Sequence, residues 1–323
     1  MARTTNDPAV PKEVPRFFTL IPIDTKIDFV RLAPVMVGAS LALVVLSIVL
    51  VAARGLNYGT DFAGGSLVQV AFTQATTATD VREALEQGKV AGAVVQDIGP
   101  EHTDFEIRVA KVAEGQAEAA SNSVRTALQA GFGEGSYEVL RVDTVGPKVG
   151  RDLWRDATLA VIAATVLMAA YIAVRFDFRF GLGAAIALGH DVAVTLGALA
   201  LAQMEVDLTT VAALLTIVGF SVNDTVVISD RIRENLQKRR RDTLPNLINL
   251  SINETMSRTI ITSGTAILVV IVLFLLGGDV IHSFAFSLLV GFVAGVYSSV
   301  YVAAPIVLWL ERWGRRPAPA QAK

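Results

Sequence analysis

The sequence predicts a polytopic α-helical membrane protein with six transmembrane helices and a small α+β domain inserted between the first helix and the second. Three observations predict this fold class. The chain of 323 residues is 53% hydrophobic, its mean hydropathy is +0.53, and several apolar segments reach the roughly 20 residues that a helix needs to cross the hydrocarbon core. The formal charge of -2 gives no sign of a nucleic-acid partner or of a disordered polymer.

The transmembrane helices are expected at 34–53, 156–174, 181–202, 208–229, 259–276 and 283–310. These spans divide the chain into an N-terminal tail (1–33), a first helix (34–53), an inserted domain (54–150), a bundle of five helices (151–310) and a C-terminal tail (311–323). The inserted domain is long enough to have a core of its own, whereas the other loops are short.

Positive charges near the helix ends predict the orientation. Lys and Arg precede the first span, follow the sixth, and occupy the loops between the second and third and between the fourth and fifth spans, while the loops at 203–207 and 277–280 contain none. Such residues tend to stay in the cytoplasm. Both termini are therefore expected on the cytoplasmic side, with the inserted domain outside; three arginines that flank this domain weigh less, because long domains cross largely regardless of charge.

The first span is expected to be an uncleaved anchor. Residues 51–53 resemble a signal-peptide cleavage site, but the apolar segment before them exceeds the usual length of about 7–15 residues and follows a long tail. The absence of cysteine is compatible with an oxidising exterior and predicts no disulfide framework.

The inserted domain shows the periods of four strands and two helices. Strands are expected at 66–72, 93–98, 105–110 and 137–145, and helices from Thr79, as the capping residue before Asp80 and Glu83, and over 116–129. This order, βαββαβ, is that of a ferredoxin-like domain.

Two glycine-rich stretches border this domain, at 57–65 and 145–150. A phosphate-binding loop is disfavoured for the first, because no Gly-Lys-Ser/Thr follows and a strand is expected next. Tight turns and hinges are expected instead, since glycine permits positive φ angles. The residues concerned are Gly64, Gly65, Gly146, Pro147 and Gly150.

Four ionisable side chains lie within the expected spans. Each requires a charged or hydrogen-bonding partner, a water-filled cavity or a functional role, because burying a charge in the membrane costs at least about 2.5–3.5 kcal/mol. They are His190, Asp191, Asp224 and Arg258. The depths of Asp224 and Arg258 are compatible with pairing. Two interpretations stay open for this pair: a proton pathway, or a static ion pair that holds two helices together.

Helical spacing predicts two polar stripes that face each other across this pair. On the fourth span the stripe consists of Ser221, Asp224, Thr225 and Ile228, and on the fifth span of Arg258, Thr262 and Thr265. Gly291 and Gly295 predict close helix packing in the sixth span.

The other polar residues of the membrane spans are expected to support this pair. His190 and Asp191 are adjacent and therefore point about 100° apart on a helix, so a metal site from this pair is not expected; a packed, hydrogen-bonded role and a transport role both stay open. Asn223 is expected to make interhelical hydrogen bonds. The basic run at 238–241 is expected to set topology and to meet anionic lipid.

Several motifs, taken in order, resemble those of the SecF membrane subunits of the bacterial SecD–SecF protein-export family, within the RND superfamily. They are DFAGG at 61–65, VGPKVG at 145–150, GHDV at 189–192, GFSVNDT at 219–225, SDRIREN at 229–235 and RTIITSGT at 258–265. The resemblance covers nearly the whole chain except the N-terminal tail. It implies an RND-type half of six helices, and it implies that Asp224 and Arg258 take part in proton transport.

The resemblance also implies the biological setting. The expected partners are a SecD-like subunit with a homologous six-helix half, the SecYEG translocon, a YajC-type small subunit, unfolded preprotein and the lipid bilayer, with no nucleic acid. The expected role is to use the proton-motive force in late steps of Sec-dependent translocation across the bacterial cytoplasmic membrane, as a transport subunit and not an enzyme, without cofactor or metal.

Two alternatives belong to other classes. Half of a proton-driven RND exporter of small molecules or lipids is disfavoured, because such chains usually contain both halves and far larger external domains. An intramembrane aspartyl protease would use Asp191 and Asp224 as a dyad. It is disfavoured because neither residue lies in a Gly-x-Gly-Asp sequence, and Arg258 near Asp224 opposes the sharing of one proton.

Overall fold

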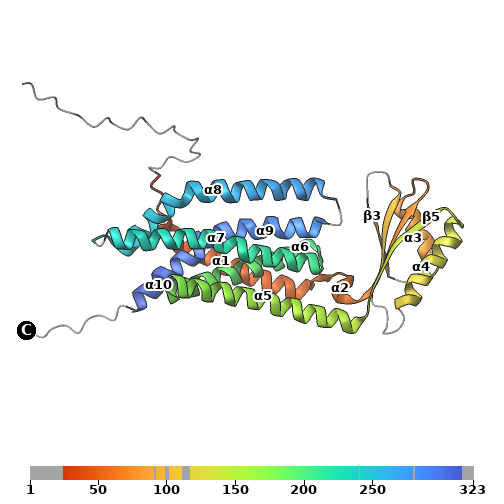
Figure 1. Cartoon of the computed structure of the whole chain (residues 1–323), viewed down its shortest axis with the longest axis horizontal. Coiled ribbons are helices and arrows are strands. Elements are labelled where there is room, and N and C mark those ends of the chain that lie inside the picture. Colours follow the sequence, from red (N-terminus) through yellow and green to blue (C-terminus); the bar gives the residue numbers. More distant parts are fainter. Residues whose placement is uncertain are drawn as a thin grey trace, which may run out of the picture.

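A computed structural model of the chain describes residues 25–314 except 91, 99–101, 111–116, 240 and 279–280. The molecule is elongated, with a helical bundle at one end and the inserted domain at the other (Figure 1). Within the described residues, six helices are long and apolar enough to cross a membrane: Phe29–Arg54, Pro147–Arg175, Phe178–Ala202, Leu208–Lys238, Leu244–Leu276 and His282–Glu311. Each contains one expected span, so the predicted fold class is confirmed.

The first five of these helices are α1, α5, α6, α7 and α8, and the sixth is divided. It consists of α9 (His282–Ser298), a π-helical segment η2 (Ser299–Ala303) and α10 (Ala304–Gly314). A π-helical turn inside an α-helix is rare and is frequent at functional sites. The described ends of the chain, residues 25 and 314, lie at the end of the bundle opposite the inserted domain (Figure 1).

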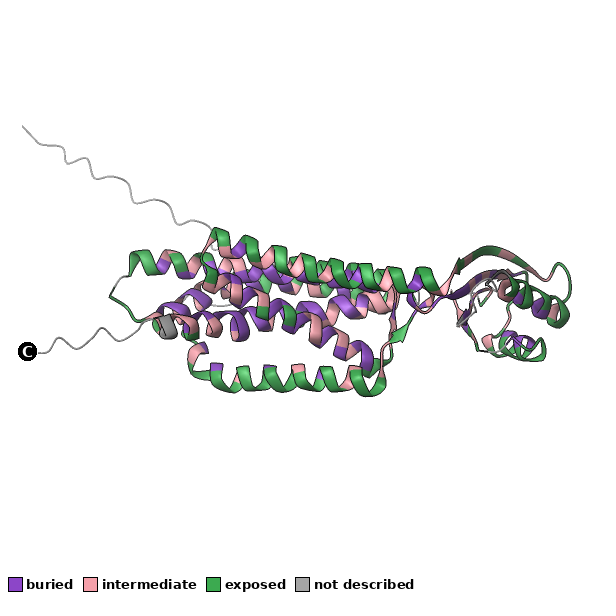
Figure 2. Cartoon of the chain, turned by 90° about the horizontal axis from the view of Figure 1, so that it is seen from below, coloured by how far each residue is buried: buried purple, intermediate pink, exposed green. Residues whose placement is uncertain are grey.

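The centre of the bundle consists of α6, α7 and α9. In α6 and α7, 56% of the apolar stretch is buried within the chain, and in the sixth span 61%, against 17% or less in α1, α5 and α8. Figure 2 shows the resulting pattern, with buried residues where helices face one another and exposed residues on the outer faces. The outer helices therefore present apolar surface to lipid or to a partner.

Close packing of α9 on α7 confirms the interpretation of Gly291 and Gly295. A Cβ atom on Gly291 would lie 2.2 Å from Ile217 Cδ1, and one on Gly295 would lie 3.0 Å from Ser221 Cβ. Small residues allow such an approach between membrane helices.

The inserted domain has the predicted βαββαβ order. Its elements are β2 (Gly65–Phe72), α3 (Ala78–Gln87), β3 (Ala93–Asp97), β4 (Asp104–Ala110), α4 (Ala117–Phe132) and β5 (Tyr137–Val145). The strands pair antiparallel in the order β3-β4-β2-β5, which is the ferredoxin-like arrangement. The helices α3 and α4 pack on one face of this sheet through a core that includes Val70, Phe105, Ile107, Val124 and Leu128.

The predicted capping residue of α3 was wrong by two positions. Thr77 precedes the helix, its hydroxyl accepts from the Asp80 backbone N–H, and the Asp80 carboxylate accepts in return from the Thr77 backbone N–H. This reciprocal capping box requires the acidic residue three positions after the cap. Thr79 has the wrong spacing and lies inside α3.

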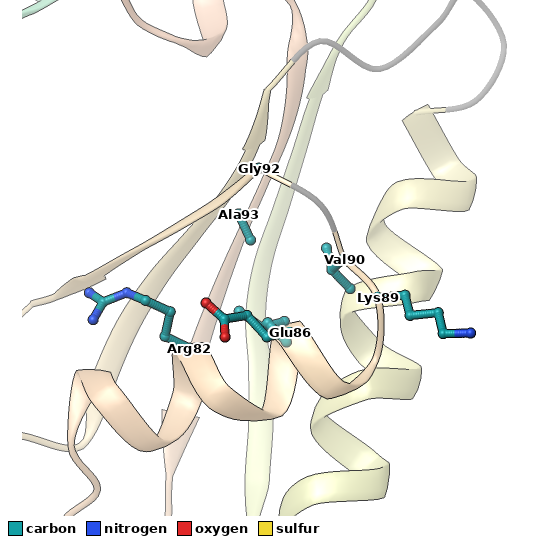
Figure 3. Close-up of a pocket in the computed structure, with 7 residues that line it drawn as sticks. Arg82, Glu86, Lys89, Val90, Gly92 and Ala93 are labelled. Carbon is teal, nitrogen blue, oxygen red and sulfur yellow. The ribbon is translucent and has the colours of Figure 1, made fainter.

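A surface cavity of about 370 Å³ lies between α3 and the edge strand β3. Arg82 and Glu86 bring opposite charges to its rim, whereas Lys89 points away from it (Figure 3). The cavity therefore concentrates no single charge, and it lies in the inserted domain, apart from the polar residues of the bundle.

The first glycine-rich stretch is more structured than a hinge. It contains a two-residue strand, β1 (Asn57–Tyr58), and a short helix, α2 (Thr60–Ala63), and β1 pairs in parallel with β6 (Glu205–Val206) between α6 and α7. Gly64 and Gly65 have φ angles of 73° and 155°, the positive values that a turn of this kind requires.

The second stretch differs from the expected turn. Gly146 precedes α5 with an ordinary φ of -69°, and Pro147 is its first residue, where the missing N–H costs nothing. Gly150 lies inside α5 and not in a turn. Its role is close approach, because a Cβ atom there would lie 2.7 Å from the Phe62 carbonyl oxygen.

Candidate functional site

Polar side chains gather in the middle of the bundle, where apolar packing is otherwise continuous. The buried members come from α6, α7, α8, α9 and η2, and are His190, Asp191, Thr195, Ser221, Asp224, Thr225, Ser263, Ser298 and Ser299. Both α6 and α7 are positioned by capping aspartates: Asp177 accepts from the Arg179 N–H, and Asp207 accepts from the Thr210 N–H at 2.8 Å. The two intramembrane carboxylates have separate surroundings.

Asp224 is held by α8. Its side chain is 3% exposed and accepts a hydrogen bond of 2.8 Å from the Ser263 hydroxyl. The Asn223 amide approaches it at 3.5 Å from the neighbouring position. Asn223 itself is exposed and makes no interhelical hydrogen bond within the described residues, so that expectation was wrong for the chain alone.

Arg258 does not pair directly with Asp224. It is exposed, and in the described part of the chain no ion pair joins the two residues, although the guanidinium is near enough to interact with the carboxylate through space. The residue of α8 that meets Asp224 is Ser263, which lies about 100° around the helix from Thr262. The direct contact of Asp224 with α8 is therefore a hydrogen bond from Ser263 and not an ion pair with Arg258.

The predicted stripe on α8 faces outward, because the side of α8 that meets α7 is the side of Ser263 and not that of Thr262. Thr262 and Thr265 are exposed, and their hydroxyls donate to carbonyl groups of their own helix, those of Arg258 and Ile261, both at 2.9 Å. The stripe on α7 is buried as predicted, but its members face two directions: Asp224 bonds to α8, while Ser221 and Thr225 bond to α6 and η2.

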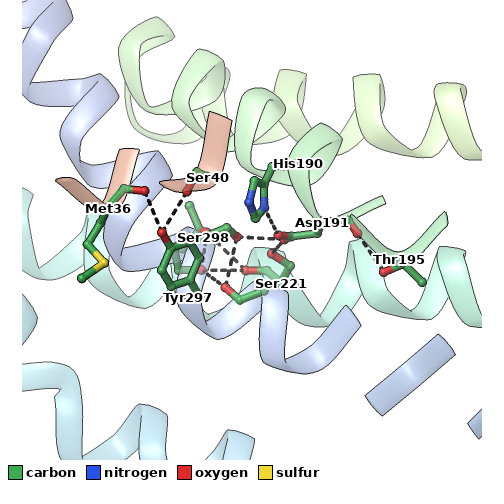
Figure 4. Close-up of polar contacts among 11 residues, drawn as sticks. Met36, Ser40, His190, Asp191, Thr195, Ser221, Tyr297 and Ser298 are labelled. Atoms are coloured by element: carbon green, nitrogen blue, oxygen red, sulfur yellow. Dashed lines mark hydrogen bonds and ion pairs between the residues drawn. The ribbon is translucent and has the colours of Figure 1, made fainter. Parts of the chain in front are cut away.

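His190 and Asp191 form one cluster, contrary to the expectation that adjacent residues would point apart. His190 Nδ1 lies 2.9 Å from Asp191 Oδ1, and the two side chains converge in Figure 4. Asp191 is 0% exposed, and its Oδ2 accepts from the Ser221 hydroxyl at 2.6 Å and from the Ser298 hydroxyl at 2.9 Å. Side-chain flexibility overcomes the helical angle, because a histidine ring is long enough to bend toward its neighbour's carboxylate.

The cluster extends to two more elements. The Thr225 and Ser299 hydroxyls lie 2.9 Å apart, which joins α7 to the first residue of η2. The Tyr297 ring stacks near His190 with centroids 6.0 Å apart, and its hydroxyl donates to the Met36 carbonyl at 2.7 Å. Ser40 of α1 donates to the same tyrosine hydroxyl at 3.0 Å. The arrangement links α1, α6, α7 and the sixth span (Figure 4).

Sequence reasoning missed Ser263, Tyr297, Ser298 and Ser299. A signal for the last two existed, because 291, 295, 298 and 299 follow helical spacing, so the two serines lie on the face that the glycines bring against α7. Ser263 has no such signal, because its neighbour Thr262 lies four residues from Arg258 and Ser263 lies five.

The loop between α6 and α7 contacts the border of the inserted domain. The Leu208 N–H donates to Asp61 Oδ2 at 3.1 Å, the Gly59 N–H donates to the Val206 carbonyl at 2.9 Å, and Arg108 of β4 forms an ion pair with Glu205. Trp154 of α5 packs edge-on against Tyr58 and Phe62. We call this set of contacts the junction. It ties the inserted domain to the loop that connects the helices carrying Asp191 and Asp224.

Comparison with known proteins places these features in a family. Residues 124–313 match the model of the C-terminal part of the protein export membrane proteins SecD and SecF, and residues 49–76 match the SecD/SecF GG motif.

Two relatives are similar over nearly their whole length. The chain is 42% identical over 308 residues to a protein translocase subunit SecF of Gemmatimonas aurantiaca, covering 93% of this chain and 92% of the relative. It is 40% identical over 293 residues to the SecF subunit of Vibrio alginolyticus, covering 91% and 92%.

A solved structure agrees with the fold. The crystal structure of SecDF, a translocon-associated membrane protein from Thermus thermophilus, matches with a TM-score of 0.76 and 34% identity, covering 91% of this chain. The chain spans 40% of that SecDF chain. From the family model and the relatives together, the chain belongs to the SecD/SecF family of protein-export membrane proteins.

Proposed function

We propose that this chain is the SecF half of a proton-driven export complex, in which Asp224 binds and releases the transported proton and Arg258 controls its charge. The carrying observation is the position of Asp224: a buried carboxylate held by one hydroxyl from α8, on a helix whose first turn is tied to the inserted domain. As a transport subunit it has no catalytic role of its own.

The geometry supports a two-state element. An ionised Asp224 accepts from Ser263 and interacts with the Arg258 charge, whereas a protonated Asp224 loses the electrostatic part of both interactions. One charge that moves through 100 mV releases about 2.3 kcal/mol, and a shift between two states needs only a few kcal/mol. Protonation of this single residue is therefore sufficient to change the packing of α7 against α8.

The exposed face of α7 supports a second helical half as the partner. Ala212, Thr216, Gly219 and Asn223 are exposed and follow helical spacing, and a Cβ atom on Gly219 would meet nothing within 4 Å. A stripe of small and polar residues is typical of helix–helix contact in membranes, whereas lipid provides no partner for the amide of Asn223. A SecD-like subunit, as in the SecDF structure, fits this face, and Arg258 and Thr262 are also exposed on α8.

The junction supports transmission to the inserted domain. A change in α7 reaches the domain through Leu208 and Asp61, and a change in the preceding loop reaches it through Glu205 and Arg108. The domain would then move and hold an emerging unfolded preprotein on the outer side of the bacterial cytoplasmic membrane. This setting includes SecYEG and a YajC-type subunit as partners, with both termini of the chain in the cytoplasm.

The separation of the two carboxylates argues against an aspartyl dyad. Asp191 is bonded to His190, Ser221 and Ser298, and Asp224 to Ser263 and its neighbour Asn223, so the two share no partner among the residues that the structure describes. Two carboxylates that share a proton must lie in direct contact.

The proposal is tested by export into inverted vesicles that contain the chain and its partner, with and without an uncoupler. Asp224→Asn keeps the shape and the Ser263 contact but removes the titratable charge. We expect normal assembly and loss of the uncoupler-sensitive part of export. A variant that assembles and retains normal uncoupler-sensitive export would show that Asp224 has only a structural role. Ser287→Ala is the control, since Ser287 is buried in α9 and, among the described residues, its hydroxyl bonds only to the Ser283 carbonyl.

A further inference from the structure

The His190 and Asp191 cluster contains an atom that the fold does not explain. His190 is 5% exposed, and its Nε2 has no hydrogen-bond partner among the described residues, although the other nitrogen is bonded to Asp191. Within the bundle it is the one buried side-chain nitrogen or oxygen of the described residues in this condition. Buried polar groups are almost always paired, so an unpaired one requires an explanation.

Every protonation state of the pair leaves this nitrogen open. If Nδ1 carries the ring proton and donates to an ionised Asp191, then Nε2 is an unpaired acceptor. If both ring nitrogens are protonated, or if Asp191 is protonated and donates to Nδ1, then Nε2–H is an unpaired donor. Nε2 therefore lacks a partner among the described residues in each of these states.

We infer that His190 and Asp191 form a second proton-binding site of the bundle, which exchanges a proton with water at Nε2. A proton bound at Nε2 displaces the Nδ1 proton toward Asp191 Oδ1, so that a neutral imidazole faces a neutral carboxyl group. Only N–H and O–H bonds form and break, and release follows the reverse path. This inference deepens the proposed function by adding a proton site to the same bundle.

The second step is a change at the start of η2. The Ser298 hydroxyl lies within reach of two acceptors, Asp191 Oδ2 at 2.9 Å and the Gly295 carbonyl at 3.2 Å. An ionised carboxylate is the stronger acceptor. Neutralising Asp191 therefore shifts Ser298 toward Gly295, whose carbonyl also accepts from the Ser299 hydroxyl at 2.9 Å and from the Ser299 backbone N–H. The proton site is thus coupled to the boundary between α9 and the π-helical segment η2.

The ionisable side chains on the elements around the pair are few. Tyr297 of α9 is the ionisable side chain stacked on His190, and Tyr301 lies in η2. On α7, Asp224 lies three residues beyond Ser221, and on α5 Tyr171 is exposed. Between Arg31 and Arg54, α1 contains no Asp, Glu, Lys, Arg or His, and Glu311 lies toward the C-terminal end of α10. The hydrogen bonds of the pair within the described residues are therefore those between its own members and with the two serines.

The test uses the three histidines of the chain. His102→Gln together with His282→Gln leaves His190 as the single histidine, so its ring nitrogens can be followed by nitrogen-15 NMR in the full chain in lipid nanodiscs. We expect the ring signals to change with pH in one sigmoidal step while circular dichroism remains constant. Ring signals that stay unchanged over the whole range in which the chain is folded would overturn the inference.

Two further variants in the same background separate a shared proton from an isolated histidine. Asp191→Asn and Ser298→Ala should each move the midpoint by about one pH unit or more, because each removes a charge-assisted hydrogen bond of the pair. The matched serine control, Ser287→Ala, should leave it unchanged. An identical midpoint in all four proteins would show that no proton is shared. The NMR measurement does not depend on export. It can therefore support the His190–Asp191 site even if the proposed role of Asp224 is wrong, and it can contradict that site even if the role of Asp224 is right.

Discussion

Asp191 and Asp224 lie on neighbouring helices of one bundle, yet the chain surrounds them differently. Asp191 is 0% exposed and receives two serine hydroxyls besides His190, all from the chain itself. Asp224 receives one hydroxyl, from Ser263, and lies beside the outward-facing Asn223 and Arg258. The chain itself supplies the donors of Asp191 and leaves His190 Nε2, among the described residues, as the unpaired atom of that site, whereas Asp224 lies next to side chains that face away from the chain. A partner can therefore reach the surroundings of Asp224 more directly than those of Asp191.

The largest expected effect is on stability, and it separates the two sites. Asp191→Ala leaves Ser221, Ser298 and His190 without their acceptor in a buried place, at a cost of about 1–3 kcal/mol for each unsatisfied group. Asp224→Ala frees one hydroxyl of α8 and should cost less. The measurement is the thermal unfolding midpoint of the detergent-purified chain. Equal midpoints for the two variants would contradict the difference between the sites.

The second largest effect is expected on the exposed face of α7, beside Asp224. Gly219→Leu should lower the yield of complex with the SecD-like subunit more than tenfold, a change of about 1.4 kcal/mol or more in association. The chain itself has room for the side chain at Gly219 and at Gly38 of α1, because neither Cβ position meets an atom within 4 Å. Gly38→Leu is therefore the control for co-purification. Full recovery of the complex with Gly219→Leu would show that the SecD-like subunit does not pack on this face of α7.

A smaller effect is expected from the single hydroxyl that holds Asp224. Ser263→Ala removes a hydrogen bond to a charged group, which contributes about 1.5–3 kcal/mol when the group is ionised. Uncoupler-sensitive export should fall roughly tenfold, less than in Asp224→Asn, because the titratable group remains. The same measurement on Ser287→Ala supplies the reference. Export unchanged in Ser263→Ala would indicate that the α8 contact does not influence Asp224.

The smallest effect is expected at the junction, far from both carboxylates. Arg108 and Glu205 are partly exposed, at 22% and 21% of their side chains, and pairs of this kind contribute about 0–1 kcal/mol. Glu205→Gln should speed hydrogen exchange of β1 and β6 by up to roughly fivefold. Asp143→Asn is the control, since its partner Arg141 lies on the same strand, β5, and neither residue belongs to the junction. Equal exchange rates in both variants would show that the ion pair of Arg108 and Glu205 does not contribute to the coupling between the bundle and the inserted domain.

Local patterns predicted the architecture and most polar residues of the site. The six spans follow from apolar length, and the order of strands and helices follows from period. Interactions across helices were less predictable, because a rotation of about 100° separates Thr262 from Ser263 and cannot be determined from spacing alone. The same limit explains Asn223, which faces outward, and His190, whose ring bends toward the adjacent carboxylate.

Contacts between distant segments were the least visible in the sequence. The pairing of β1 with β6 joins residues that are far apart along the chain, and two-residue strands leave no period to detect. Gly150 was interpreted as a turn because glycine serves both positive φ angles and close packing, and only the position of Phe62 distinguishes the two.

The central claim is that Asp224 carries the proton through this bundle, and proton flux tests it most directly. The chain and its SecD-like partner are reconstituted in liposomes with a pH-sensitive dye inside, and an imposed pH gradient is followed with time. We expect Asp224→Asn to reduce flux to the level of protein-free liposomes while the complex remains intact. Flux in Asp224→Asn equal to that of the unmodified complex would contradict the account.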